Sequence, residues 1–243
     1  MKISDIFSRF LHLCSVPACI SCGERLDFSD LAFCSECYDK FSAAKKQDCS
    51  RCAKALPKCT CTNEFLSSHF VKGLVKVFRY RPAEKENAPE NMLIYAIKRE
   101  ERYDVIKRAV LELRLAIENS LDINEDVVFT SVPRRKSAIL EYGVDHAAKI
   151  AKLLSKEFGA KYLPLLGSRA KKAQKTLTRI ERLKNAEFVI RKDLDLSGKT
   201  AVLVDDVVTT GASMASAAAL IRSLGCKKIY GACLGIAYRD SII

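Results

Sequence analysis

The pattern of apolar and polar positions divides the chain from residue 69 onward into strands and helices. Residues 69–82 alternate apolar and polar side chains, which predicts one strand leading into a turn at Pro82. Residues 83–91 are charged and contain Pro89, and they predict a loop that begins a new element. From Met92 to Ile117 the apolar positions follow a helical period that breaks near Tyr103, so we expect two helices there.

The remainder of the chain alternates apolar strands with helices. The pattern predicts strands at residues 127–132, 162–166, 200–204 and 228–234, and helices at residues 144–158 and 213–224. Gly159 and Gly225 follow the two helices, as glycine commonly does at helix ends. Strands and helices at this spacing indicate a parallel α/β sheet. We expect His146 on a helix surface, with ligand contact as the alternative.

Cysteines are concentrated at the start of the chain, where nine of the eleven lie between Cys14 and Cys61. They form two sets, Cys19-x-x-Cys22 with Cys34-x-x-Cys37, and Cys49-x-x-Cys52 with Cys59-x-Cys61. Two such turns can complete a closed tetrahedral site, which suits a structural zinc ion. Disulfides and a redox pair are the alternatives, but dense cysteine in a reducing compartment favours metal. Cys14 is a spare that replaces a ligand or is buried, and we expect Cys226 and Cys233 in the core.

The charge is strongly positive and unevenly spread. The net charge is +12, and residues 131–185 hold 14 Lys or Arg against 4 Asp or Glu. This excess suggests nucleic acid or phosphorylated small molecules as partners, with solubility alone as the alternative. The apolar runs are too short for a membrane span. We expect an amphipathic helix rather than a signal peptide over residues 3–13, and hence a cytoplasmic protein.

A second chemical signal is the run from Ala201 to Ser213. An apolar strand is followed by Asp205 and Asp206, and then by Thr209, Thr210, Gly211, Ala212 and Ser213, which open a helix. The free N–H groups and positive dipole end of a helix favour a phosphate, and adjacent carboxylates suit ribose hydroxyls. In an open α/β sheet, ligands bind at the carboxyl ends of the strands. An ordinary capped helix is the alternative.

Residues 202–213 resemble the ribose-5-phosphate loop of type I phosphoribosyltransferases. With the cysteines, nearly the whole chain is similar to the ComF family, which joins a double zinc ribbon to a phosphoribosyltransferase domain. The run Gln174-x-x-Leu177-Thr178-x-x-x-Arg182-x-x-Asn185 is similar to that family's Gln-x-x-Leu-Ser-x-x-x-Arg-x-x-Asn segment. The resemblance implies a lid carrying Gln174, Arg182 and Asn185, whereas the residues alone would favour a solvated basic helix.

A further part of the resemblance is Val132-Pro133 at a strand end, followed by Tyr142-Gly143-Val144-Asp145-His146. The family has Arg-Gly-Phe-Asn-Gln at the latter place, so four positions differ. The loop here binds pyrophosphate in related enzymes, which makes Arg134, Arg135 and Lys136 the candidate pyrophosphate ligands. Lys98 resembles a lysine of the family's Leu-Lys-Tyr segment, with Arg99 in place of the tyrosine.

The resemblance implies a type I phosphoribosyltransferase-like α/β fold, with a parallel sheet flanked by helices and a small N-terminal zinc-ribbon module. We expect an N-terminal helix at residues 1–13, a double zinc ribbon at 14–66 and a phosphoribosyltransferase-like domain at 67–243. The expected ligand is phosphoribosyl pyrophosphate with Mg²⁺, beside structural zinc.

Three functional hypotheses remain open. The first is an enzyme that transfers phosphoribosyl groups to an acceptor; some purine-salvage relatives carry an Asp at the position of Thr209 that is missing here. The second is a non-catalytic protein that senses the ligand and handles single-stranded DNA with a helicase partner, because the ComF resemblance implies DNA uptake in natural competence. The third is a zinc-dependent regulator or scaffold that uses the fold only for protein contacts.

Overall fold

The structure is a computed structural model of the whole chain. It describes residues 17–27, 31–81, 88–99, 102–123, 126–134, 145–168 and 188–237. The predicted N-terminal helix at residues 3–13 and Cys14 lie outside these residues, as does most of the predicted loop at residues 83–91.

The described part of the chain contains helices, short turns of helix and strands in the following order. The helices are α2 (Ser35–Lys45), α3 (Glu64–Ser68), α4 (Pro89–Arg99), α5 (Tyr103–Ser120), α7 (His146–Glu157) and α9 (Ala212–Ser223), with a 3₁₀ turn at Leu56–Lys58. The strands are β1 (Val71–Arg79), β2 (Val127–Ser131), β3 (Lys161–Tyr162), β4 (Leu166–Ser168), β5 (Phe188–Ile190), β6 (Thr200–Val208) and β7 (Lys228–Ile236).

A five-stranded sheet in the order β1-β7-β6-β2-β3 forms the centre of the molecule, and all of its pairs are parallel. β4 and β5 form a separate antiparallel pair. Because all five strands run the same way, their carboxyl ends meet at one edge. The parallel sheet expected from the sequence is therefore present in the described residues.

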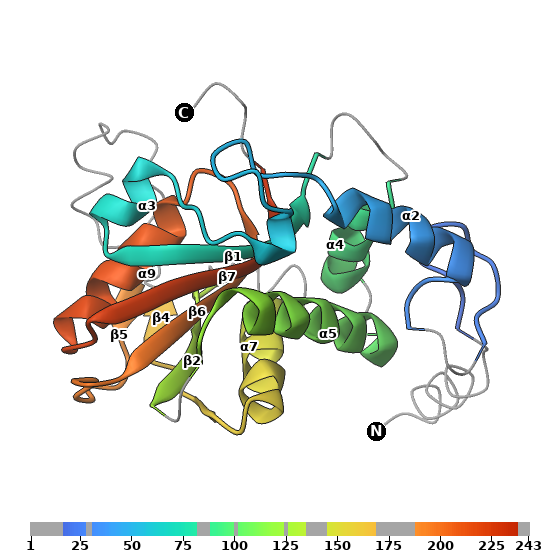
Figure 1. Cartoon of the computed structure of the whole chain (residues 1–243). Helices are drawn as coiled ribbons and strands as arrows, with labels where there is room; N and C mark the ends of the chain where they lie inside the picture. The colour runs from blue at the N-terminus through green and yellow to red at the C-terminus, as the bar shows by residue number, and fades with distance from the viewer. Residues whose placement is uncertain are drawn as a thin grey trace, which may run out of the picture.

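Helices cover both faces of the sheet, and side chains alternate between the faces as a strand requires. On β6, Val202 and Val204 pack with α4, α5 and α7, whereas Ala201 and Leu203 pack with α9. All four of these side chains are fully buried. In Figure 1 the strands fan across the molecule, with α5 and α7 on one side of the sheet and α9 at the other.

The two cysteine sets pack against opposite faces of this sheet. Cys19, Cys34 and Cys37 belong to the core beneath α4 and α5. Cys49 and Cys59 belong to the core beneath α9. Figure 1 shows the same division: α2, which begins after Cys34, lies above α4 and α5, and α3, which follows Cys61, lies by α9. The N-terminal module is therefore wrapped around the sheet rather than set apart from it.

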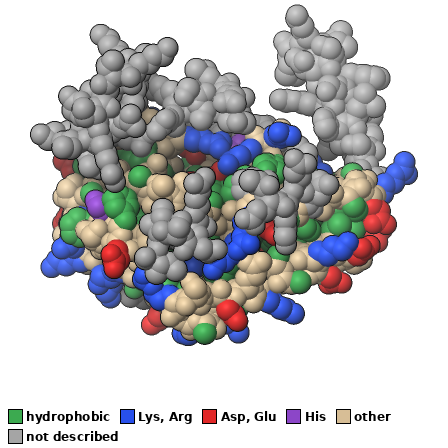
Figure 2. All heavy atoms as spheres, turned by 90° about the horizontal axis from the view of Figure 1, so that it is seen from above, with side chains coloured by type: hydrophobic (Ala, Val, Ile, Leu, Met, Phe, Trp, Pro, Cys, Tyr) green, Lys and Arg blue, Asp and Glu red, His purple; other side chains and the backbone are tan. Residues whose placement is uncertain are grey.

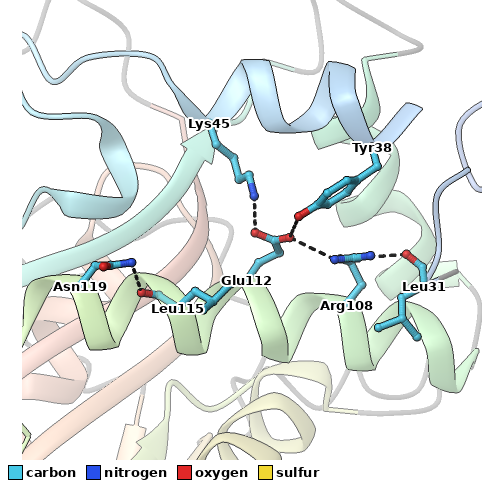
Figure 3. A network of polar contacts seen from close by, with 7 residues as sticks. All are labelled: Leu31, Tyr38, Lys45, Arg108, Glu112, Leu115 and Asn119. Atoms are coloured by element: carbon cyan, nitrogen blue, oxygen red, sulfur yellow. Dashed lines mark hydrogen bonds and ion pairs between the residues drawn. The ribbon is translucent and has the colours of Figure 1, made fainter. Parts of the chain in front are cut away.

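A buried ionic network joins α2 to α5. Glu112, whose side chain is 2% exposed, accepts from Lys45 Nζ at 2.5 Å and pairs with Arg108 at 3.4 Å. The Tyr38 hydroxyl donates to the same carboxylate at 3.4 Å, and Arg108 Nε donates to the Leu31 carbonyl at 3.0 Å (Figure 3). The guanidinium of Arg108 also lies 4.4 Å from the Tyr38 ring centre. One carboxylate thus pairs with two cations at the contact between the module and the sheet's helices.

Most of the predicted elements appear within a few residues of their expected bounds, but two expectations were wrong. The new element expected to begin within residues 83–91 is α4, which starts at Pro89, where proline suits the first helical position. The strand predicted at residues 162–166 is split into β3 and β4, because Pro164 has no N–H to donate to a neighbour. The strand predicted at residues 200–204 runs on to Val208.

Candidate functional site

The extension of β6 changes where the paired acids lie. Asp205 and Asp206 were expected at the end of the strand, yet the strand continues past both to Val208. It does so because β7 continues to pair alongside: Asp205 opposes Cys233 and Val207 opposes Gly235. The two carboxyl groups fold back on the backbone, since Asp206 N donates to Asp205 Oδ1 at 2.9 Å and Val207 N to Asp206 Oδ1 at 2.8 Å. Both acids are half-buried at the carboxyl edge of the sheet.

Asp206 is held between two cations from other elements. Lys98 Nζ, at the end of α4, and Arg134, just after β2, each lie 3.5 Å from Asp206 Oδ2. Asp205 differs from its neighbour: burial and the adjacent charge of Asp206 raise its pKa well above the usual value. The carboxyl edge therefore offers one acid paired with two cations, and a second acid whose ionisation is disfavoured.

The loop after β6 has the form expected of an anion site. Gly211 is the N-cap of α9 and has a φ of 84°, a left-handed conformation that favours glycine. The first backbone bond of the helix runs from Ala215 N to Gly211 O, so the amides of Ala212, Ser213 and Met214 have no acceptor within the helix. Thr210 Oγ1 accepts from Ala212 N at 3.3 Å. Thr209, Thr210 and Ala212 are exposed, and Ser213 is half-buried.

The expectation for His146 was wrong, because its side chain is 3% exposed rather than on the helix surface. Asp145 caps α7 by accepting from Ala148 N at 3.0 Å, which places His146 in the first turn. Burial and the nearby Arg134 lower the pKa of His146, while Asp206 opposes them. Within the described residues, its Nε2 atom is buried without a hydrogen-bond partner. A neutral imidazole thus lies close to the Arg134–Asp206 pair.

The sequence contained a signal for this burial that the prediction did not use. His146, Ile150 and Leu154 are spaced four residues apart, and all three are buried on α7. Leu66 is a second residue that the sequence did not point to. Its side chain is fully buried against Gly211, and a Cβ placed on that glycine would lie 2.9 Å from Leu66 Cγ.

Several predicted ligand residues lie outside the described part of the chain. These are Arg135 and Lys136 of the pyrophosphate set, and Gln174, Arg182 and Asn185 of the lid. The described residues do bring Asp205, Asp206, Arg134 and the loop from Thr209 to Ser213 to the same edge. Figure 2 shows Lys and Arg side chains and a histidine gathered in the upper middle of the face seen there.

Each cysteine set places four sulfur atoms where they could hold one metal ion. The ligand atoms of Cys19, Cys22, Cys34 and Cys37 lie within 4.8 Å of one another, and the same holds for Cys49, Cys52, Cys59 and Cys61. The Sγ atoms of Cys22 and Cys34 are 3.7 Å apart, and those of Cys52 and Cys59 are 3.5 Å apart. A tetrahedral zinc ion with Zn–S bonds of ~2.3 Å would require sulfur pairs about 3.8 Å apart. The geometry fits such an ion.

The thiols have the electrostatics of metal ligands. Burial opposes ionisation of Cys49, but backbone hydrogen bonds from Arg51 and Cys52 bring its pKa down to about 6. In the first set, burial likewise opposes ionisation of Cys19, yet backbone hydrogen bonds lower its pKa to about 7. Burial and the neighbouring thiols raise the pKa of Cys61 to about 12. One thiolate forms readily in each set, and a cation would be needed to hold the others ionised.

Among the helices that the structure describes, none has the length and apolar character needed to cross a bilayer.

Comparison with known protein families gives one match over more than half of the chain. The family described as phosphoribosyl transferase domain matches residues 96–237, which include α4 from Ala96, all the strands from β2 to β7, and the loop at Thr209–Gly211. Among curated proteins, the ribose-phosphate pyrophosphokinase of Methanopyrus kandleri is 29% identical over 137 residues, or 49% of this chain and 47% of the relative. That of Thermococcus kodakarensis is 53% identical over 38 residues, which are 16% of this chain and 14% of the relative. The chain spans less than half the length of the curated relatives it matches.

Solved structures give a weaker likeness. The purine phosphoribosyltransferase of Pyrococcus horikoshii is 22% identical with a TM-score of 0.37, over 57% of this chain and 76% of that one. The adenine phosphoribosyltransferase of Saccharomyces cerevisiae is 18% identical with a TM-score of 0.33, over 62% and 69% of the two chains. At this similarity neither structure assigns a ligand to the present chain.

Proposed function

The chain belongs to the phosphoribosyl transferase domain family, and on that premise we propose that it binds phosphoribosyl pyrophosphate, or a closely related sugar phosphate, at the carboxyl edge of its sheet. The observation that carries this proposal is the Gly211-capped start of α9 directly after the paired acids of β6. Helix amides without an intrahelical acceptor attract a phosphate. The two acids precede the start of that helix by only a few residues.

The parts of the ligand are assigned to three groups. Residues 209–213 would hold the 5-phosphate through backbone amides and hydroxyls. Asp205 and Asp206 would accept hydrogen bonds from the ribose hydroxyls. Arg134 would contact the pyrophosphate, with Arg135 and Lys136 as further candidates and the lid residues Gln174, Arg182 and Asn185 closing over the ligand. The 3.5 Å ion pairs of Asp206 with Lys98 and Arg134 support the pyrophosphate assignment, because they place two cations beside the ribose acids.

The reaction favoured by this arrangement is a phosphoribosyl transfer. Such a transfer breaks the bond between the ribose anomeric carbon and pyrophosphate, so negative charge grows on the leaving group. Lys98 and Arg134 can neutralise part of that charge, and the anchored phosphate fixes the ribose in place. Mg²⁺ that accompanies the pyrophosphate would supply further charge neutralisation when bound.

We infer that the molecule is organised as in the ComF family. The two cysteine sets would each bind a structural zinc ion within a double zinc ribbon at residues 14–66, before a phosphoribosyltransferase-like domain at residues 67–243. A role in natural competence and a cytoplasmic location follow from the same resemblance. The sulfur geometry of both sets supports the zinc assignment.

A second candidate is a non-catalytic protein that senses the sugar phosphate and handles single-stranded DNA with a helicase. The net charge of +12, and the 14 basic against 4 acidic residues at 131–185, support it. Binding of this kind is electrostatic, so its affinity should fall steeply as salt rises. A fluorescence titration of labelled single-stranded DNA at rising salt tests it, and affinity that is independent of salt would argue against it.

Calorimetric titration with phosphoribosyl pyrophosphate and Mg²⁺ tests the main proposal. We expect the intact chain to bind and Asp205→Asn/Asp206→Asn to lose most of the affinity, with metal content unchanged. Equal binding by both proteins would refute the ribose assignment. Release of pyrophosphate on addition of candidate acceptor bases then separates an enzyme from a sensor.

A further inference from the structure

The residues on either side of the phosphate loop (residues 209–213) share one hydrophobic core with the second cysteine set. Cys49 and Cys59 pack there with Leu66, Val208 and Met214, which flank the loop from both sides. The first cysteine set belongs to the other core, on the opposite face of the sheet. Only one of the two sets is therefore in a position to influence the loop by direct packing.

The second set is fastened to β1 by hydrogen bonds from a buried lysine. Lys76 is 2% exposed, and its Nζ donates to the Cys61 carbonyl at 2.8 Å and to the Cys59 carbonyl at 3.4 Å. Leu74 N donates to the Thr60 carbonyl at 3.0 Å. The backbone that carries two of the four thiols is thus fixed against the strand.

A few residues after Cys61 the chain reaches Leu66, which packs against the loop at Gly211. Asn63 caps α3 by accepting from Leu66 N at 2.8 Å, and the Arg51 side chain, from the same cysteine set, donates to the Thr62 carbonyl at 2.6 Å. These bonds fix α3 relative to Cys61. The capped turn directs Leu66 onto Gly211, where its Cγ lies 2.9 Å from the place a Cβ would take.

We propose that Leu66 is a positioning residue for the phosphate loop, and that through it the loop's anion-binding shape depends on the second cysteine set but not on the first. The inference rests on the proposed function, because it assigns the loop to a phosphate. Its physical basis is that Gly211, with a φ of 84°, has no side chain to hold its own conformation. The leucine packed against its Cα restricts the loop instead, and so keeps the amides of α9 pointing at one place.

The test compares Leu66→Ala with Leu113→Ala, since both leucines are fully buried but Leu113 lies on α5 in the opposite core. Calorimetry with ribose 5-phosphate reports on the loop, and calorimetry with inorganic pyrophosphate reports on the cationic side of the site. We expect Leu66→Ala to weaken ribose 5-phosphate binding about tenfold and leave pyrophosphate binding unchanged. Leu113→Ala should change neither, and Leu66→Met, which conserves volume, should restore the affinity.

Two cysteine variants test the dependence on the second set. Cys61→Ser and Cys22→Ser each remove one ligand that is not fully buried, from the second and the first set respectively. We expect both variants to lose bound metal in a metal analysis. Only Cys61→Ser should also lower the affinity for ribose 5-phosphate. Equal ribose 5-phosphate affinities of Leu66→Ala and Leu113→Ala, or equal effects of the two cysteine variants, would overturn the inference. Failure of the unmodified chain to bind ribose 5-phosphate would instead overturn the proposed function.

Discussion

Replacing Glu112 by Gln should destabilise the protein strongly, because it leaves two buried cations without their shared anion (Figure 3). The side chains of Lys45 and Arg108 are only 16% and 12% exposed, and that of Glu112 is 2% exposed. Breaking a buried ion pair by removing one partner typically costs about 3–5 kcal/mol. Lys45 retains the ring of Phe41, at 4.9 Å, and Arg108 retains the Leu31 carbonyl. We therefore expect the lower figure, about 3 kcal/mol.

Urea unfolding followed by circular dichroism measures this loss. With an m value of about 2–3 kcal/mol/M, a loss of ~3 kcal/mol lowers the midpoint by roughly 1 M. Glu118→Gln is the matched control: its carboxylate is 45% exposed and pairs with Arg114 at 3.3 Å. An exposed pair of this kind contributes at most about 1 kcal/mol. Adding Lys45→Met to Glu112→Gln should recover part of the stability, because one stranded cation is removed with its partner.

The reasoning would be refuted if Glu112→Gln and Glu118→Gln shifted the midpoint equally. A loss of the single transition in Glu112→Gln, with α2 unfolding before the sheet, would also be informative. It would mean that the network, rather than the apolar contacts, makes the cysteine-rich module and the sheet unfold together.

Three further predictions follow from single residues. Asp205→Asn should raise the free energy of unfolding at pH 7 while weakening ligand binding, because the raised folded-state pKa of Asp205 means that its ionisation opposes folding at neutral pH and an amide removes that penalty. A lower melting temperature of the variant would contradict this. His146→Gln should reduce the loss of stability in acid, because a folded-state pKa of His146 below 6.5 means that the native protein loses stability as pH falls through 6.5. An equal drop of the urea midpoint between pH 7.5 and 5.5 in the variant and the unmodified protein would contradict this. Gly211→Ala should lower the free energy of unfolding in urea by at least about 1 kcal/mol and weaken phosphate binding, since alanine is strained at a φ of 84° and its Cβ would meet Leu66. An unchanged unfolding free energy and phosphate affinity would contradict this and show that the loop adapts.

The elements that the sequence predicted well are those whose signals are local. The strand at residues 228–234 and the helix at residues 213–224 have apolar patterns and a glycine boundary, and β7 and α9 were found close to them. The cysteine spacing predicted two sets, and the sulfur atoms of each set do converge. The order of strands and the placing of the two sets on opposite faces depend on contacts between distant segments, which no local pattern encodes.

The wrong expectations also come from contacts and patterns that a local interpretation of the sequence misses. The two acids of β6 look like the end of a strand by polarity, but pairing with Cys233 and Gly235 of β7 carries the strand past them. Helix α2 was not predicted, because the region was interpreted by its cysteine spacing, although Cys37 and Phe41 share a buried face at helical spacing. The roles assigned to the ligand residues stay predictions until a ligand is bound.

The wrapping of the cysteine-rich module around the sheet has a consequence for solubility. β1 is an outer strand of the five-stranded sheet, and the segment at Cys59–Cys61 lies along its free side, where Leu74 N meets the Thr60 carbonyl. Open edges of apolar strands recruit further strands from other molecules. Removal of the proposed zinc with a chelator should therefore expose the β1 edge, and its first sign should be light scattering that grows with protein concentration.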